Sequence, residues 1–197
     1  DSDGGIMRNR DVNKWGRRAR KEAAYFDGRQ FAARNLYWKN YVINASGVLF
    51  RRQYALNLAE SDFIRMRCCG DWLFWFQMAL QGGVGMIYRN LNYFRQHTAK
   101  VTVASTRSGE SIREGLQVVQ KMEKELPLLK EYKKRLCRGR FYRRIKRSSL
   151  SEECKEELFD ELSAVLGGTV ADYRLERLNQ FLRVLNPFIL TPGRDRL

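Results

Sequence analysis

The spacing of hydrophobic residues divides the chain into three zones. Up to about Lys39 the apolar residues follow no regular period and basic residues crowd the segment, so we expect an irregular loop there. In residues 40–106, short β-branched or aromatic runs surround one long apolar segment. Beyond that zone, apolar residues recur every three or four positions, which is typical of amphipathic helices. The pattern predicts an α/β region over residues 1–106 and a mainly helical extension over residues 107–197.

The middle zone contains the segments that most resemble a protein core. Residues 41–43 and 48–50 are β-branched or aromatic, and they predict two strands that meet at a turn. Residues 71–80 are apolar on nearly all sides, which predicts a buried helix because such a helix has no side for water. Asp71 stands where the N-cap of that helix would be. Residues 84–94 alternate loosely between apolar and polar, and predict a strand or a hairpin.

Four helices are expected in the extension. Ser111 and Glu114 form a capping-box pattern at the start of the first, and Pro127 fits the first turn of the second. The third begins at Ser151, and the fourth ends at Asn186. Apolar residues of the fourth helix recur at positions Val170, Tyr173, Leu178, Phe181, Leu182 and Leu185.

Composition excludes several classes of protein. The chain has 197 residues, of which 44% are hydrophobic and 12% aromatic, and a chain disordered throughout lacks such content. It has no apolar run of the roughly 18 residues that indicates a membrane-spanning helix. The four cysteines form no C-x-x-C pair and His97 is the only histidine, so we expect neither a disulfide framework nor a structural zinc site. We therefore predict a cytoplasmic location.

The net charge of +15 is concentrated in one run that begins at Lys130 and ends at Arg147. This run contains ten basic residues, and Glu131 is its only acid. Three interpretations remain open: a solvated helix face, docking to an anionic membrane surface with Phe141 and Tyr142 as interfacial anchors, or binding to nucleic acid. Neither a zinc finger nor an RNA-binding aromatic signature accompanies the charge, so nucleic acid is the least favoured partner.

Two acidic features could carry chemistry. Asp1 and Asp3 are separated by one residue, so in an extended segment both carboxylates leave on one side and can hold Mg²⁺ or Mn²⁺. The alternative is a solvated acidic terminus. Asp71 is either a plain helix cap or a general base that takes a proton from a sugar hydroxyl.

The neighbouring aromatic and histidine residues allow the same two kinds of interpretation. Trp72, beside the acid, suits stacking on the face of a sugar, whereas core packing explains Trp75. His97 follows a strand-like run that ends at Arg95. It is either a structural histidine or a ligand of a metal or a phosphate.

Three blocks of sequence resemble family 2 glycosyltransferases. Residues 44–52 resemble the family's "N-x-S-x-V-hydrophobic-F-R-R" strand, residues 70–75 its "G-D-W-x-F-W" helix start, and residues 91–97 its "L-N-Y-F-R-x-H" segment. The blocks follow in the family's order and at its spacing. Residues 1–3 then fall where the family's metal-binding D-x-D motif belongs.

The resemblance implies a GT-A fold, a Rossmann-like nucleotide-sugar domain. This chain would supply the second half of that domain, followed by the helical extension. By this resemblance, Asp1 and Asp3 would bind a Mg²⁺ or Mn²⁺ ion that contacts the donor diphosphate. Asp71 would be the general base of an inverting displacement. His97 would complete the metal site or contact the diphosphate, with Arg95 beside it at the donor.

By the same resemblance, Trp72 and Asn44 would contact the acceptor. The full-length protein would transfer a sugar from a nucleotide-diphosphate sugar, such as a UDP-sugar, to a saccharide or lipid-linked acceptor. In the family most of the nucleotide pocket precedes the D-x-D motif. We therefore expect a fragment that binds donor weakly or not at all by itself.

One alternative of a different class remains open. In this alternative the chain is a basic binding module without catalytic activity. It docks either to the anionic surface at the inner membrane face or to nucleic acid. In this alternative the resemblance to glycosyltransferases is incidental.

Overall fold

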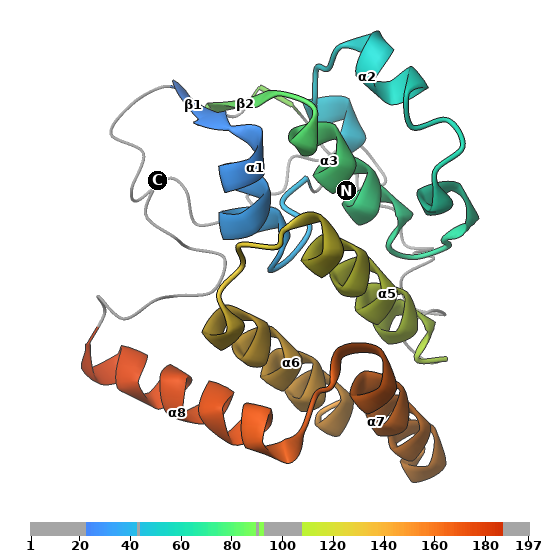
Figure 1. Ribbon diagram of the computed structural model, residues 1–197, viewed down its shortest axis with the longest axis vertical. Coiled ribbons are helices and arrows are strands. Elements are labelled where there is room, and N and C mark those ends of the chain that lie inside the picture. Colours follow the sequence, from blue (N-terminus) through green and yellow to red (C-terminus); the bar gives the residue numbers. More distant parts are fainter. Residues whose placement is uncertain (1–22, 43, 90, 93–107, 187–197) are drawn as a thin grey trace, which may run out of the picture.

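A computed structural model describes residues 23–42, 44–89, 91–92 and 108–186, and the statements below concern these residues. They form a mostly helical protein with one small two-stranded sheet (Figure 1). The expectation of strands followed by a helical extension is confirmed at this coarse level.

The sheet pairs two segments that are far apart in the sequence. Strand β1 (Ala23–Asp27) runs antiparallel to strand β2 (Gly83–Ile87), with Asp27 opposite Gly83. β2 confirms the first part of the strand predicted at residues 84–94. β1 lies in the zone where an irregular loop was expected.

That expectation of a loop is wrong for residues 23–39. After β1 the chain forms helix α1 (Gly28–Phe31) and a π-helical turn, η1 (Ala32–Leu36). Phe31 and Leu36 are buried, as are the aromatic side chains that follow. Elements of four or five residues are too short to produce a period in a window of 11 or more residues, so the pattern missed them.

The strands predicted at residues 41–43 and 48–50 are also not found in the described residues. The chain there is irregular apart from a 3-10 turn, η2 (Ala45–Gly47). Leu49 is fully exposed, so no partner covers it. The β-branched composition alone did not suffice, because a strand also needs a neighbouring strand to satisfy its backbone.

The buried helix of the middle zone is confirmed. Short helices α2 (Arg52–Leu56) and η3 (Asp62–Arg65) lead to helix α3 (Gly70–Leu80). The buried residues of α3 are mostly aromatic and aliphatic: Trp72, Leu73, Trp75, Phe76 and Ala79. Its N-cap is Cys69, so Asp71 lies in the first turn and is not the cap itself.

All four helices predicted for the extension are present. They are α5 (Glu110–Glu125), α6 (Glu131–Lys146), α7 (Glu152–Leu166) and α8 (Val170–Leu185). As predicted, Ser151 caps α7, where its side chain accepts a hydrogen bond from the Cys154 N–H at 3.3 Å.

Two of the predicted helix starts are wrong. α5 is capped by Gly109, whose φ of 72° lies in the left-handed region, and Ser111 is already inside the helix. Glu114 does not complete a capping box, because its carboxylate binds a different segment. Pro127 precedes α6, which has Lys130 as its N-cap.

One hydrophobic core spans the predicted boundary between residues 106 and 107. Leu36 and Phe76 belong to the same cluster as Val119, Leu136 and Leu158, and all five are at most 1% exposed. Helix α5 lies between α3 and α6 (Figure 1). The extension therefore packs directly on the segment that carries Asp71.

Helix α8 packs on α6 through its polar side. Its buried residues are Asp172, Glu176 and Asn179, whereas Phe181 and Leu185 are more than 60% exposed. Ion pairs and a hydrogen bond between side chains join the two helices: Arg135 Nε to Asp172 Oδ1 (2.7 Å), Arg143 Nη2 to Glu176 Oε1 (3.3 Å) and Tyr132 OH to Asn179 Oδ1 (2.9 Å). Amphipathic helices generally bury their apolar side and expose their polar side. Helix α8 does the opposite.

Close approach of α6 and α8 depends on Gly139. A Cβ there would lie 2.3 Å from the carbonyl oxygen of Asp172 and 2.7 Å from the Cβ of Glu176. We expect Gly139→Ala to lower the free energy of unfolding by about 1 kcal/mol or more. A Cβ this close to a backbone oxygen falls toward the upper end of the about 1–3 kcal/mol that overpacking costs, while the helix propensity of alanine recovers only about 1 kcal/mol.

Denaturant unfolding measures this change. Gly85→Ala is the control, because no atom lies within 4 Å of the added Cβ. The control should stay within about 0.5 kcal/mol of wild type. Equal stabilities for Gly139→Ala and wild type would contradict the packing described here.

Candidate functional site

Asp71 is held from two sides while its side chain stays exposed. Its Oδ1 accepts a hydrogen bond from the Trp72 N–H at 2.7 Å, and its Oδ2 accepts one from Asn40 Nδ2 at 2.9 Å. Asn40 also accepts from the Val42 N–H through its Oδ1 at 3.0 Å, which orients its amide. The carboxylate is therefore fixed in direction but accessible to a substrate.

The surroundings of Asp71 alter its acidity in a way that suits a base. Partial loss of hydration near the protein raises the pKa of Asp71, and the hydrogen bonds from Trp72 and Asn40 oppose that rise. A general base is most effective when its pKa lies near the working pH. The net upward direction moves this carboxyl toward that range.

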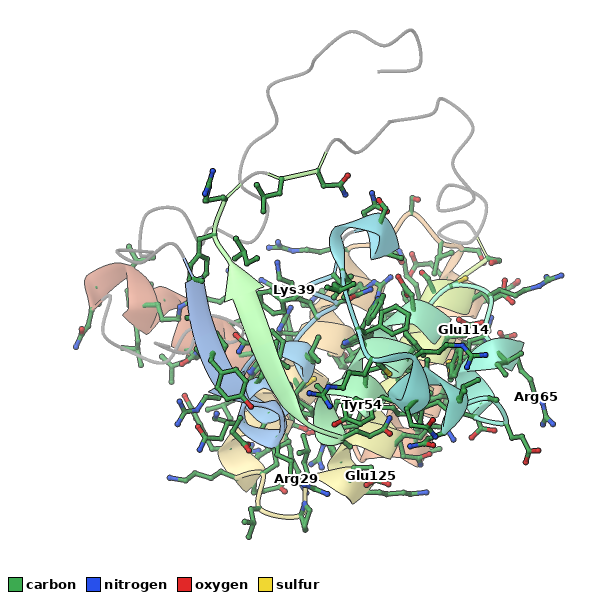
Figure 2. All side chains as sticks on the ribbon, turned by 90° about the horizontal axis from the view of Figure 1, so that it is seen from above. Arg29, Lys39, Tyr54, Arg65, Glu114 and Glu125 are labelled. Atoms are coloured by element: carbon green, nitrogen blue, oxygen red, sulfur yellow. The ribbon has the colours of Figure 1, made fainter. Side chains whose placement is uncertain are left out.

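A buried carboxylate of α5 fixes where α3 begins. Glu114 Oε1 accepts from the Arg67 N–H at 2.7 Å, and its Oε2 accepts from the N–H groups of Cys68 and Cys69 at 2.7 and 2.8 Å. Glu114 is 8% exposed and lies among the packed side chains of α3 and α5 (Figure 2). This clamp sets the turn that immediately precedes Asp71.

An open hollow of about 740 Å³ lies near Asp71, which does not itself line it. Asn40, which bonds Asp71, and Trp72, the next residue in the chain, both line it. Five cationic side chains also line it, and no acidic residue does; the cations are Lys39, Arg140, Arg143, Arg144 and Arg147.

The four arginines share one side of α6 because their spacing is that of successive helical turns. Arg144 Nη2 donates to Ser111 Oγ at 2.9 Å, and the Arg140 guanidinium lies 5.7 Å from the centre of the Trp38 ring. Burial lowers the pKa of Arg143 and Arg144, yet guanidinium groups remain charged in proteins. The hollow is therefore strongly positive.

The two predicted acceptor residues have other contacts. Trp72 is 8% exposed and its Nε1 donates to the Leu36 carbonyl at 2.6 Å, so packing accounts for most of its surface. Its remaining edge lines the hollow. Asn44 Oδ1 accepts from the Ser46 N–H at 3.2 Å and caps η2, and it does not line the hollow.

The predicted metal and donor residues cannot be placed in this site. Asp1, Asp3, Arg95 and His97 lie outside the described residues. In the part of the chain that the structure describes, no three His, Cys, Asp or Glu residues gather into a group able to hold a metal ion.

Within the described residues, the first of the three sequence blocks that carry the family resemblance contacts each of the other two. Asn92 Nδ2 donates to Ser46 Oγ at 3.1 Å, which joins the first block to the third. The Phe50 ring lies edge-on to Phe74 and Trp75, at 6.0 and 5.9 Å between centroids, which joins the first block to the second.

The membrane interpretation of the run from Lys130 to Arg147 needs a correction. Phe141 is 7% exposed, and Tyr142 packs against Phe159 and Tyr173 with centroid distances of 4.3 and 5.2 Å. Phe141 is therefore buried, and Tyr142 is half-buried against α7 and α8.

Sequence reasoning missed Asn40 and the role of the α6 arginines. Residues 140, 143, 144 and 147 follow the spacing i, i+3, i+4, i+7, which already places them on one side of a helix. The high charge of the whole run hid that pattern. Asn40 gave no comparable signal.

The comparisons with known proteins identify no family for this chain. No protein-family model matches it, and no curated protein or solved structure matches it either. Among the described helices, none has both the length and the apolar character needed to cross a membrane. The resemblance to family 2 glycosyltransferases thus remains a prediction from the residues themselves.

The Glu114 clamp can be tested by Glu114→Gln. A glutamine keeps one acceptor oxygen and replaces the other with an NH₂ group, which faces backbone N–H donors. Hydrogen bonds to charged groups contribute roughly 1.5–3 kcal/mol each, so we expect the free energy of unfolding to fall by about 2–4 kcal/mol.

Denaturant unfolding provides the measurement, and Glu125→Gln, an exposed change in the last turn of the same helix, is the control. The control removes the same charge and should alter stability by less than about 0.5 kcal/mol. If Glu114→Gln and Glu125→Gln unfold alike, the clamp does not hold the turn.

Proposed function

We propose that this chain is part of an inverting glycosyltransferase in which Asp71 is the general base. One observation supports the proposal most directly: the Asp71 carboxylate is oriented by Asn40 and the Trp72 N–H, and both of these residues line a positively charged hollow. A carboxylate in that position can receive a proton from a hydroxyl group bound in the hollow.

In the proposed reaction the oxygen of the acceptor hydroxyl attacks the anomeric carbon of the donor sugar, and Asp71 takes the proton of that hydroxyl. The new glycosidic bond forms as the bond from that carbon to the nucleoside diphosphate breaks. The electron pair of that bond leaves with the diphosphate. Attack from the side opposite the leaving group inverts the configuration.

The donor side of this proposal rests on the sequence alone. Arg95 and His97 are the proposed contacts of a nucleotide-diphosphate sugar, with UDP as the expected nucleotide. Asp1, Asp3 and His97 are the proposed ligands of Mg²⁺ or Mn²⁺, which would neutralise charge on the departing diphosphate.

Asp71→Asn tests the assignment of the base. An asparagine retains the shape of the side chain and cannot accept the proton, so sugar transfer by the full-length protein should fall by a factor of about 10²–10⁴. The measurement is release of nucleoside diphosphate in the presence of acceptor. Asp160→Asn on the exposed side of α7 is the control and should leave the rate unchanged. An Asp71→Asn protein that folds and transfers at the wild-type rate would refute the assignment.

The pH profile of Asn40→Ala gives a second readout of the same assignment. The hydrogen bond from Asn40 lowers the pKa of Asp71, so its removal raises that pKa. Transfer requires the deprotonated carboxylate and is lost as pH falls through this pKa. The acid limb of the profile should therefore move to higher pH in Asn40→Ala.

A second candidate function, docking to an anionic membrane, is favoured by the outer side of α8. That side exposes Leu178, Phe181 and Leu185 together with Arg174 and Arg177. Both acids of the helix, at positions 172 and 176, are buried against α6. A helix surface that is apolar and basic suits the interface of an anionic bilayer. A second copy of the same basic surface would be repelled. We therefore propose α8, in place of the α6 aromatic residues, as the membrane contact.

Co-sedimentation with phosphatidylglycerol vesicles tests this surface. The double change Phe181→Ser/Leu185→Ser removes two side chains of the kind that contribute about 1.5–3 kcal/mol each when fully buried, so binding should weaken about tenfold or more. Leu128→Ser is the control, because Leu128 is 94% exposed and lies off α8. Equal weakening in both proteins, or equal binding to neutral phosphatidylcholine vesicles, would count against the proposal.

A further inference from the structure

Three of the four arginines of the hollow have no acid paired with them among the described residues. Arg143 pairs with Glu176 at 3.3 Å. For Arg140, Arg144 and Arg147, no carboxylate of the described residues forms an ion pair. Like charges gathered on one side of a helix repel one another. This cost is offset when an anion binds between them.

Two buried hydrogen-bond donors belong to the same surface. The Nη1 atom of Arg140 and the Nε1 atom of Trp38 have no acceptor among the described residues, and Trp38 is 3% exposed. Both residues line the hollow. Buried donors are nearly always paired in proteins, so these two atoms add to the excess of hydrogen-bond donors over acceptors in the residues around the hollow.

These properties define the class of ligand. The guanidinium group presents donors in a fixed planar fork that matches phosphate oxygens, and arginine is over-represented where phosphate is recognised. Several cations around one hollow favour a group with more than one negative charge, such as a phosphate monoester or a diphosphate. A volume of about 740 Å³ leaves space for such a group together with a sugar.

The position of the hollow relative to Asp71 indicates which of the two substrates, donor or acceptor, binds in the hollow. In an in-line displacement the base and the departing diphosphate of the donor lie on opposite sides of the anomeric carbon. The hollow lies on the side of the base, since Asn40 bonds Asp71 and also lines the hollow. We propose that the hollow binds the phosphate or diphosphate group of the acceptor. This assignment to the acceptor rests on the proposed glycosyltransferase function.

Binding of inorganic pyrophosphate, measured by titration calorimetry, tests the anion site without any need for turnover. We compare wild type with Arg140→Gln/Arg147→Gln, which removes two cations that no described carboxylate pairs. Each charged hydrogen bond is substantial, so the dissociation constant should rise about tenfold or more. Circular dichroism and thermal unfolding establish that the variant folds.

The matched control is Arg65→Gln/Arg89→Gln, which removes the same charge at two exposed positions that do not line the hollow. Arg65 projects outward at the edge of the molecule (Figure 2). Its pyrophosphate affinity should stay within about twofold of wild type, because exposed charges away from the hollow are screened. Absence of pyrophosphate binding by wild type, or equal loss in both double variants, would overturn the proposal.

Kinetics of the full-length protein separate acceptor from donor. The Arg140→Gln/Arg147→Gln change should raise the KM for acceptor and leave the KM for the nucleotide sugar unaltered. A raised KM for the donor alone would overturn the assignment to the acceptor. If the variant loses affinity for phosphatidylglycerol vesicles while wild type binds no pyrophosphate, the arginines serve a lipid surface and the proposal is wrong.

Asp71→Asn distinguishes failure of this inference from failure of the proposed function. That variant should bind pyrophosphate at least as tightly as wild type does, because it loses a negative charge near the hollow. Suppose that pyrophosphate binding depends on Arg140 and Arg147 but that Asp71→Asn transfers sugar at the full rate. That result would refute Asp71 as the base and the assignment of the hollow to the acceptor. The anion site itself would be confirmed. Loss of transfer in Asp71→Asn without pyrophosphate binding would refute only the anion site.

Discussion

The arrangement of the candidate site depends on the carboxylate of Glu114. It lies in α5 and accepts hydrogen bonds from three consecutive backbone N–H groups, of Arg67, Cys68 and Cys69. Those groups precede α3 and have no partner within that helix. By satisfying them, Glu114 fixes both the start of α3 and the distance of α3 from α5. Because α5 also supplies Ser111 to the hollow, one interaction positions the base and part of the adjoining surface.

Helix α6 distributes its charge between two sides. Toward α8, Arg135 pairs with the buried Asp172 at 2.7 Å, and Arg143, which also lines the hollow, reaches Glu176 at 3.3 Å. These pairs explain why α8 can bury its polar side, since a buried carboxylate needs a charged or hydrogen-bonding partner. Toward α3, Arg140 and Arg144 line the hollow without acids beside them. The same helix is thus both a structural partner and the source of a positive surface.

The sequence predicted the elements whose signal is local. The four helices of the extension and α3 were found because each spans several turns, over which apolar spacing or an unbroken apolar run is visible. β1 was missed because its partner, β2, lies about sixty residues away and its own five residues carry no clear alternation. Glu114 was interpreted as part of a capping box, since its long-range partners at positions 67–69 leave no trace in the local pattern.

In the candidate site, too, features with a local sequence signal could be predicted, and features that depend on long-range contacts could not. Asp71 could be proposed from its neighbours in the chain, because the residues that suggest a base, Gly70 and Trp72, are adjacent to it. The hollow could not be predicted in this way, because only folding brings together the residues that line it. They lie at positions 38–40, 69–72, 111–112 and 137–148. What the sequence does contain is the spacing of the α6 arginines on one helix side. That spacing predicts a charged face, and only the packing of α6 against α5 turns the face toward a substrate-sized space near Asp71. A basic run that looks like a solvated surface in sequence can therefore acquire a binding role from its position alone.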